Sequence, residues 1–473
     1  MAKVIVEEEI YNREFVDKWT VGFNELASYL KRINLSDVSS YTTVPEEKIR
    51  EAARLYATNG PAVMKEGNGL DQHVNVVQTV RSVALIPALT GDLNVKGGNV
   101  LMPALPFKDV QARGEIPEEG WEEKSISNYP LYFGLSGALN NTELFEALET
   151  GIPYRPRSMI VQGGDIVAAN SNLELTKRLL AKMDFIAVHD LYMTASASFA
   201  DLVLPAASFL ERDLLLYYRY RPDAYSNMID LQQQVVPPVG ESRTDLELIF
   251  ELGKRLDLGD FFPWDSSIEA FNWELEPVGI TVEDLRQSSS GYRRTYEPNE
   301  LYWTDGREGF ATKSGKVELV ASKLRNSGYE ELPDKEELPD ELQPDEDYPL
   351  LCGTGLKLGI HTHTQYHKLP YLHELEPERF AEIHPDKAIE LGIASGDCVK
   401  LESKWGSVKA SARITGRVAR NVVMLAYGYG QPYATKKWKL SNELTPADHK
   451  DEISGATSNR RVPVRITREG GQD

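Results

Sequence analysis

The sequence predicts an α/β protein with parallel-sheet, Rossmann-like domains and a C-terminal β-barrel. Between residues 158 and 206, apolar strands alternate with an amphipathic helix, which is typical of an open parallel sheet that binds ligands at its strands' carboxyl ends. After residue 345, apolar and polar residues alternate between closely spaced glycine turns, which predicts antiparallel strands in a barrel or sandwich. The 473 residues, 41% of them hydrophobic, are enough for about three globular domains.

The balance of charges and the cysteine count exclude several classes of function. The chain has 52 basic and 72 acidic residues, and its net charge of −20 removes the usual electrostatic basis for binding nucleic acid or an anionic membrane. Its two cysteines, Cys352 and Cys398, are too few for a disulfide framework, a four-cysteine zinc site or an iron–sulfur cluster held by this chain alone. The N-terminal residues do not form a signal peptide, and no apolar run is long enough to span a membrane. We therefore expect a cytoplasmic protein without direct membrane contact.

Helices are expected at the N-terminus. Pro45 begins a predicted helix that Gly60 ends. A short apolar run at 61–67 predicts a strand, which a glycine turn connects to a helix from Gln72 to Gly91. An earlier helix is indicated by apolar residues at near-helical spacing, namely Phe15, Trp19, Phe23, Leu26 and Leu30.

A second strand–turn–helix unit follows, and it has the stronger pattern. Residues 158–165 read as a strand ending in a glycine pair, 171–183 as an amphipathic helix, and 184–190 and 200–206 as two more strands. From about 263 to 349 the periodicity weakens and an acidic, proline-containing run predicts a linker, with a domain boundary near residue 345.

The turn Gly163-Gly164-Asp165 is a candidate ligand site. A glycine pair between a strand and a helix lets the backbone approach a phosphate closely, and an acidic side chain can accept both donors of a guanine edge. Asp190, four residues before Thr194, supplies a second carboxylate at the same predicted sheet edge. The alternative for the glycines is an ordinary turn, and for Asp190 it is a helix N-cap.

Five of the eight histidines fall within 24 positions, which raises the question of a metal site. Their segment lacks helical periodicity and contains Gly355, Gly359 and Pro370, so the i, i+4 spacing of two of them does not place both on one helix. The favoured interpretation is a loop that hydrogen-bonds a polar ligand. The five are His361, His363, His367, His373 and His384.

Four blocks in a fixed order strongly resemble the molybdopterin oxidoreductase family, the dimethyl-sulfoxide-reductase-like group. The family's usual C-terminal segment is similar to SNELTPADHKDEISG at 441–455. The pattern is most similar to the thiosulfate/polysulfide reductase and acetylene hydratase branch, with formate dehydrogenases more distant. The blocks begin GNGLDQHVNV (67–100), DFIAVHDLYMT (184–213), GFATKSGKVEL (309–319) and HTHTQYHKLPY (361–408).

The resemblance implies a cofactor and partners. Members of this group bind two molybdopterin guanine dinucleotides around molybdenum or tungsten and catalyse two-electron oxygen- or sulfur-atom transfer. Their [4Fe-4S] domain and the residue that ligates the metal precede the stretch that matches this chain. We therefore expect one piece of a split enzyme, inactive alone, that works with an N-terminal iron–sulfur/metal-ligand chain or domain, a small-molecule substrate and, as a further candidate, an electron-transfer subunit. A non-catalytic cofactor carrier and a truncated, non-functional fragment are the alternatives.

The resemblance also implies domains. Residues 1–155 would be part of one α/β molybdopterin-binding domain, 156–250 half of another, 251–345 a connecting region with the acidic linker, and 346–473 a dinucleotide-binding barrel of double-psi type.

Residue by residue, the resemblance assigns binding roles. Asp190 and Thr194 would recognise a guanine. His73, near the metal cavity, would be catalytic and donate to substrate or pterin, with a satisfied structural histidine as the alternative. Some positions depart from the family's common residues: Lys357 and His367 stand where many members have Arg, and Asp165 replaces a common Asn. The other implied cofactor-binding residues are Gly67, Gly69, Gln72, Gln162, Gly163, Gly164, Asp165, Thr354, Gly355, His361, His363, Thr364, Gln365, Tyr427, Gly428 and Asn442.

Overall fold

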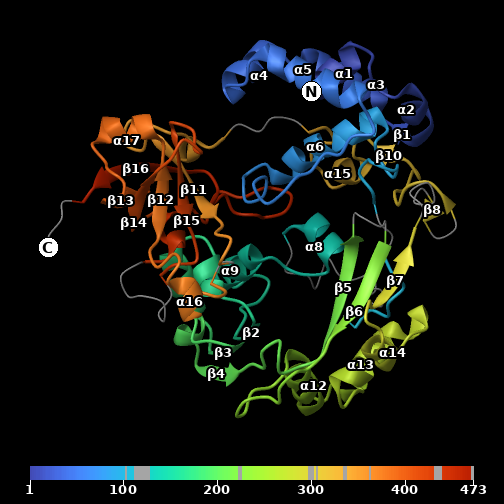
Figure 1. Ribbon diagram of the computed structural model, residues 1–473, viewed down its shortest axis with the longest axis vertical. Coiled ribbons are helices and arrows are strands. Elements are labelled where there is room, and N and C mark those ends of the chain that lie inside the picture. The colour runs from blue at the N-terminus through green and yellow to red at the C-terminus, as the bar shows by residue number, and fades with distance from the viewer. Residues whose placement is uncertain are drawn as a thin grey trace.

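In the computed structural model, the chain forms four main parts (Figure 1). In chain order these are an N-terminal helical region, a parallel sheet, an antiparallel sheet and a C-terminal barrel. Among the described residues, none of the helices is both long enough and apolar enough to cross a lipid bilayer. The structure describes residues 1–101, 104–110, 128–221, 226–296, 303–304, 307–333, 338–361, 364–430 and 439–469.

The N-terminal region is helical, as predicted, but its first predicted helix is divided in two. Gly22 separates the two parts with a φ of +84°, and a Cβ there would lie 2.7 Å from the Val320 side chain. Just before it, the strand β1 (Thr20–Val21) pairs in parallel with β10 (Val317–Glu318). The helices are α1 (Ala2–Glu7), α2 (Arg13–Trp19), α3 (Phe23–Arg32), α4 (Leu35–Thr42), α5 (Glu46–Thr58) and α6 (Val76–Thr90).

The predicted strand at 61–67 is wrong. No strand is assigned there, and the backbone of Met64 is satisfied by the side chain of Asn99 instead of a neighbouring strand. The Met64 N–H donates to Asn99 Oδ1 at 2.9 Å, and Asn99 Nδ2 donates to the Met64 carbonyl at 2.8 Å. The helix expected after this segment is present as α6, followed by Gly91 with a φ of +75°.

The parallel sheet is confirmed. Its order is β2 (Ser158–Gln162), β3 (Phe185–Asp190) and β4 (Leu202–Pro205), all parallel. The helices α10 (Ile166–Ala169) and α11 (Leu173–Leu180) contribute to the apolar core on one face, with members such as Leu173, Leu180, Ile186 and Val188.

The opposite face of this sheet is partly bare. Ile160 is 46% exposed, Phe185 41% and Leu202 44%. Ile160, Ala187 and Leu202 are in register on neighbouring strands, so their side chains lie on the same face. Phe185 lies two residues before Ala187 and therefore points to that face as well. Parallel sheets are normally covered on both faces, and this face is covered only in part, because Ala187 and His189 on the same face are 3% and 1% exposed.

The region of weak sequence signal after residue 263 is more ordered than expected, because it supplies two helices and one strand to a unit whose other two strands and first helix precede it. A three-stranded antiparallel sheet packs against two helices through Ile229, Phe271 and Leu285. Thr281 begins the second helix with a reciprocal capping box to Asp284. The elements are β5 (Leu214–Arg221), β6 (Ser226–Gln232), α12 (Asp245–Arg255), α13 (Ser267–Leu275), α14 (Val282–Gln287) and β7 (Tyr292–Thr295).

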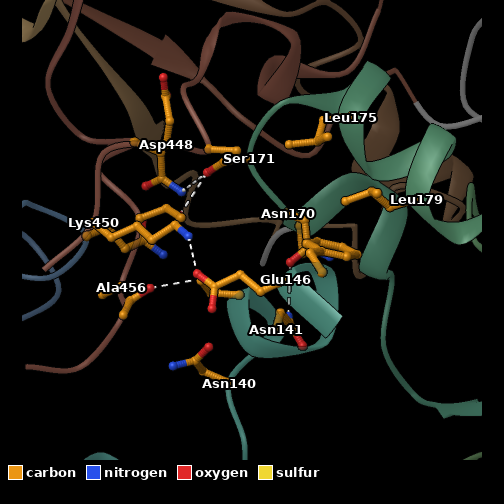
Figure 2. A pocket seen from close by; sticks show the side chains of 18 of the residues that line it. Asn140, Asn141, Glu146, Asn170, Ser171, Leu175, Leu179, Asp448, Lys450 and Ala456 are labelled. Atoms are coloured by element: carbon orange, nitrogen blue, oxygen red, sulfur yellow. Dashed lines mark hydrogen bonds and ion pairs between the residues drawn. The ribbon is translucent and has the colours of Figure 1, made fainter. Parts of the chain in front are cut away.

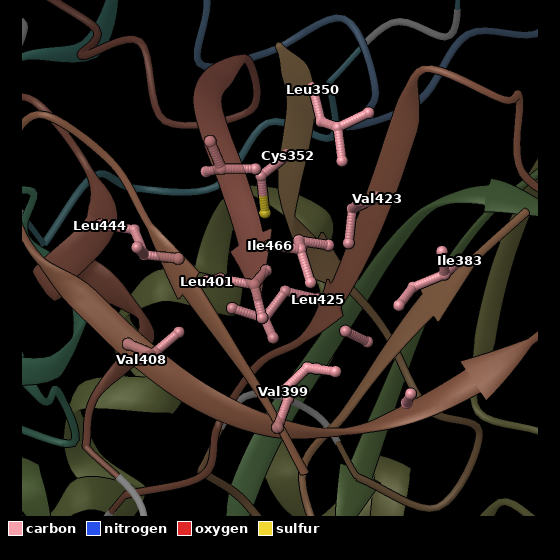
Figure 3. Close-up of a cluster of buried hydrophobic side chains, with 14 of the residues drawn as sticks. Leu350, Cys352, Ile383, Val399, Leu401, Val408, Val423, Leu425, Leu444 and Ile466 are labelled. Atoms are coloured by element: carbon pink, nitrogen blue, oxygen red, sulfur yellow. The ribbon is translucent and has the colours of Figure 1, made fainter. Parts of the chain in front are cut away.

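The C-terminal strands close into a barrel, as predicted, around an apolar core that includes Cys352, Leu401 and Leu425 (Figure 3). Two pairs, β11·β15 and β12·β14, are parallel, so the expectation of purely antiparallel strands is wrong. Alternation shows which residues face the core but carries no information on a neighbour's direction. The strands are β11 (Leu350–Leu356), β12 (Phe380–Ile383), β13 (Cys398–Glu402), β14 (Ser407–Ile414), β15 (Val422–Ala426) and β16 (Val462–Arg468).

Candidate dinucleotide site

The glycine turn after β2 is open and rigidly held. Gly163 has a φ of +57°, and a Cβ built on it would meet no atom within 4 Å. Its N–H donates to the His189 carbonyl of the next strand at 3.1 Å. An open, glycine-lined strand end is the geometry that lets a phosphate approach the backbone.

Asp165 fixes this turn to the neighbouring connection. Its Oδ1 accepts from the Ser196 backbone N–H at 3.0 Å and from Ser196 Oγ at 2.6 Å. The Val167 N–H donates in turn to Ser196 Oγ at 3.0 Å. Because its Oδ1 already accepts two protein hydrogen bonds, Asp165 acts first as a structural residue.

Asp190 lies at the carboxyl end of β3, beside this turn. Its Oδ1 accepts from the Tyr192 N–H at 3.2 Å. Burial raises the pKa of Asp190, the charge of Asp165 raises it further, and the N–H groups of Tyr192 and Leu191 oppose the shift. Asp190 is not the N-cap of the short 3₁₀ helix that follows (Ala197–Phe199), because Ser196 holds that position; the Thr194 Oγ1 accepts from the Ala197 N–H at 3.1 Å.

The turn at 67–73 joins the barrel through residues that the sequence analysis did not identify. Arg460 donates from Nε to Gln72 Oε1 at 2.9 Å and from Nη1 to the Gly355 carbonyl at 3.2 Å. The Asn459 N–H donates to the Gln72 carbonyl at 3.1 Å, and its own carbonyl accepts from Thr354 Oγ1 at 2.6 Å. Three predicted residues are thus brought together by two missed ones. The signal in the sequence that could have identified them is the pair Arg460-Arg461, which directly precedes a strand in a chain that is acidic overall.

His73 is half-buried in the same turn. Its Nε2 lies 3.2 Å from the Gly69 carbonyl, so the ring donates there from Nε2. Burial lowers the pKa of His73, and the positive charges of Arg461 and Arg460 lower it further. The imidazole is therefore neutral at neutral pH. Gly67 and Gly69 leave open space around them, because a Cβ on either would touch nothing within 4 Å.

A cavity of about 630 Å³ adjoins this junction, with Gln72 in its wall (Figure 2). It lies between α9 (Asn141–Thr150), the α10–α11 segment and residues 447–459. Lys450 Nζ pairs with Glu146 Oε1 at 2.6 Å, and Asn141 donates to Asn170 Oδ1 at 3.0 Å. Amide, hydroxyl and charged side chains line much of it, and apolar side chains such as Leu139, Leu175 and Leu179 line the rest.

Asn442 connects the barrel region to the parallel-sheet region. It lies in the 3₁₀ helix η7 (Ser441–Leu444) and is 7% exposed. Its Nδ2 donates to the carbonyls of Val167 at 2.8 Å and Asn170 at 2.6 Å. Its Oδ1 is buried without a hydrogen-bond partner in the described structure, so one acceptor remains for a ligand.

In the described part of the histidine-rich loop, two imidazole rings pack against each other. His361 is 3% exposed, and its ring stacks on His367 with centroids 3.9 Å apart. Burial lowers the pKa of His361, and His373 nearby lowers it further. Stacked rings direct their nitrogens along parallel planes, and the described residues contain no group of three His, Cys, Asp or Glu suited to a metal ion.

The remaining predicted loop residues lie in two segments, the histidine-rich loop and the turn after β15. Thr364 and Gln365 lie between the two stacked rings in the chain, half-buried and exposed respectively, whereas His363 lies outside the described residues. Tyr427 and Gly428 directly follow β15, and Gly428 has a φ of +92°.

Comparison with protein families identifies the chain. The description "Molybdopterin oxidoreductase" matches residues 2–255, and "Molydopterin dinucleotide binding domain" matches residues 354–463. The chain belongs to the molybdopterin oxidoreductase family. The second match covers the barrel and the Arg460 junction, and the first covers the glycine turn and Asp190.

Individual relatives agree with this assignment. Acetylene hydratase of Syntrophotalea acetylenica is 29% identical over 90% of this chain and 62% of that protein. The F420-dependent formate dehydrogenase subunit alpha of Methanocaldococcus jannaschii is 26% identical over 91% of this chain and 63% of the relative, and thiosulfate reductase subunit PhsA of Salmonella typhimurium is 25% identical over 92% and 61%. The solved structure of acetylene hydratase from Pelobacter acetylenicus superposes with a TM-score of 0.86 at 27% identity, over 98% of this chain and 69% of that one. The chain thus spans about three fifths of the length of these curated relatives.

The site of this family member fits a molybdopterin dinucleotide cofactor. The open space at Gly163 can accommodate a phosphate close to the backbone at the end of β2, and Asp190 supplies an acidic acceptor beside it. The buried, unpartnered Oδ1 atoms of Asn442 and Asn459 can accept from a polar ligand. The donors and acceptors needed for such a ligand are therefore present without a basic surface.

Proposed function

We propose that this chain is the cofactor-binding C-terminal part of a bis-molybdopterin-guanine-dinucleotide oxidoreductase that uses molybdenum or tungsten. The reaction proposed is two-electron oxygen- or sulfur-atom transfer to or from a small-molecule substrate. A cytoplasmic location remains a prediction. The family assignment and the barrel's match to the dinucleotide-binding description support the cofactor.

The observation that carries the proposal is the open glycine turn beside a carboxylate at one edge of the parallel sheet. In this proposal, Gln162, Gly163 and Gly164 hold the pyrophosphate of one dinucleotide through their backbone, while Asp190 and Thr194 position its guanine. Asp165 holds the turn in this shape.

The second group of residues would face the pterins. Gln72, Thr354 and Gly355, locked together by Arg460, form its centre, and Asn442 fixes the barrel against α10. The bound cofactor supplies the redox chemistry, and the chain's residues orient it and exclude water. A neutral His73 can donate a hydrogen bond to substrate or pterin, which is the catalytic role proposed for it. The further residues proposed at the pterins are Gly67, Gly69, His361, His363, Thr364, Gln365, Tyr427 and Gly428.

The partly bare sheet face favours an enzyme part over a free-standing cofactor carrier. A carrier should have a finished sheet, whereas Ile160, Phe185 and Leu202 here expose an apolar surface that a further layer would cover. We propose that this layer belongs to the iron–sulfur and metal-ligand part of the enzyme, in the same or another polypeptide. The relatives' greater lengths support this, and an electron-transfer subunit is a further proposed partner.

The experiment is to measure bound guanine nucleotide and metal in the chain isolated from a host that makes the cofactor. Acid hydrolysis would release GMP, and elemental analysis would detect molybdenum or tungsten. The variant Gly163→Ala should lose at least half of the GMP, because a methyl group fills the space proposed for the phosphate. Its matched control is Gly392→Ala at the end of a barrel helix, where φ is +65° and a Cβ likewise meets nothing.

Both substitutions impose the same backbone strain, about 1–2 kcal/mol, so a difference in GMP isolates the ligand effect. Equal retention in both variants, or wild-type protein without GMP, would contradict the proposed site. Turnover by the chain without an iron–sulfur part would contradict the proposed division of labour.

A further inference from the structure

A second cavity, of about 460 Å³, lies between α12 and α13, beside the start of β5. Aromatic rings form much of its wall. The ring centroids of Phe250 and Trp264 are 5.4 Å apart, and those of Phe250 and Phe262 are 6.3 Å apart. A volume of this size matches pockets that bind small organic molecules.

One carboxyl group in the cavity wall has no basic partner among the residues that the structure describes. The side chain of Glu274, on α13, makes no ion pair or hydrogen bond within the described part of the chain, and its charged neighbour is another acid, Asp109. The nearby Lys108 is occupied elsewhere, because its Nζ pairs with Glu276 and lies 5.2 Å from the Trp273 ring centroid.

The other charges that face the cavity are already paired. Arg212 pairs with Asp245, and Asp213 pairs with Arg286 at 2.6 Å. Glu274 is therefore the group available to a ligand. Burial raises the pKa of Glu274 to about 7, and the charge of Asp109 adds to the rise, as expected of a desolvated acid without a cation.

We propose that this cavity binds an amphipathic organic cation, a protonated amine carried on an apolar or aromatic body. The ammonium group would pair with Glu274, and the body would lie against Phe250, Phe262 and Trp264, where cation–π and apolar contacts add to the attraction. None of the residues proposed for the dinucleotide lines this cavity among those described, so the site is independent of the proposed function.

The probe is 2-phenylethylammonium, compared with neutral 2-phenylethanol and anionic 3-phenylpropanoate, added to the full chain. Binding is followed by calorimetry and by the fluorescence of Trp264. The amine should bind about tenfold more tightly at pH 8 than at pH 6, because the ionised fraction of Glu274 rises about tenfold across a pKa near 7. The alcohol should show no such pH dependence, and the propanoate should bind least.

Two variants test the assignment. Glu274→Gln should weaken amine binding at pH 8 at least tenfold and leave alcohol binding unchanged, whereas Glu283→Gln on the adjacent helix α14 is the matched control with no effect. Ala270→Leu, which extends a buried side chain into the cavity, should block both ligands. Absence of saturable amine binding, or Glu274→Gln binding like wild type, would overturn the proposal. Glu274→Gln decides the matter even if Ala270→Leu fails to fold.

Discussion

At the residue scale, the acidic side chains of the glycine turn divide their work. The sequence placed Asp165 and Asp190 at one ligand site, and the structure places both at the same sheet edge. Asp165, however, uses one oxygen to hold Ser196, whereas Asp190 sits at the strand end with its pKa raised by burial. The hydrogen bonding of each carboxylate therefore separates the structural acid, Asp165, from Asp190, which is the one we propose to contact the ligand.

Replacing Asp165 should distinguish these roles. Asp165→Ala leaves the buried Ser196 N–H without its acceptor and should lower the free energy of unfolding by about 2–3 kcal/mol. Asp165→Asn keeps an oxygen acceptor and should cost about 1 kcal/mol or less. Urea unfolding of the three proteins measures the difference. Equal losses in both variants would show that the negative charge, rather than the acceptor, stabilises the turn.

At the element scale, one side chain connects two regions that are far apart in the sequence. Asn442 on η7 satisfies the carbonyls of Val167 and Asn170 from α10 and the residue after it. The contact fixes the barrel region against the dinucleotide turn.

We expect Asn442→Ala to destabilise the protein by about 1–3 kcal/mol, because two carbonyls lose their donor. Asn442→Asp should cost more, because it buries a carboxylate against two carbonyl oxygens. Thermal unfolding measures the effect, and limited proteolysis should show earlier cleavage between the two regions. The exposed Asn421 is the matched control: its Ala and Asp variants should change stability by about 0.5 kcal/mol at most. If Asn442→Asp did not lower the stability of the protein, the proposed contribution of the hydrogen bonds between Asn442 and α10 would be contradicted.

At the scale of the whole molecule, the bare face of the parallel sheet governs association. Its three exposed apolar residues, Ile160, Phe185 and Leu202, lie on three neighbouring strands of the sheet. A net charge of −20 opposes self-association at low salt, and added salt screens that repulsion. The isolated chain should therefore self-associate through this face as the salt concentration rises.

The combined variant Ile160→Thr, Phe185→Thr and Leu202→Thr should remain monomeric in 0.5 M salt and bind less of the dye ANS than wild type. Threonine keeps the β propensity of these positions while removing apolar surface. Light scattering after gel filtration measures the mass. Phe261→Thr, which removes a ring that is 71% exposed elsewhere, is the control and should not change association. Unaltered association of the triple variant would show that another surface is responsible.

Local pattern was sufficient for much of the fold. The alternating strands and helix of 158–206 predicted the parallel sheet, and the alternation after residue 345 predicted the barrel. These predictions succeed because an element that is buried on one or two faces has hydrophobic residues at a characteristic spacing along the sequence. The apolar run at 61–67 failed because nothing local tells a strand from an extended segment held by a single side chain such as Asn99.

The sequence by itself determined the family, the parallel sheet, the barrel and the glycine turn, because each produces a pattern in residues that are close together in the chain. Only the tertiary structure decided that Arg460 links Gln72 to Gly355, that Asp165 is tied to Ser196, and that two barrel strand pairs run parallel. These are contacts between residues up to 388 positions apart, and nothing in the local order of a chain fixes which distant groups meet when it folds.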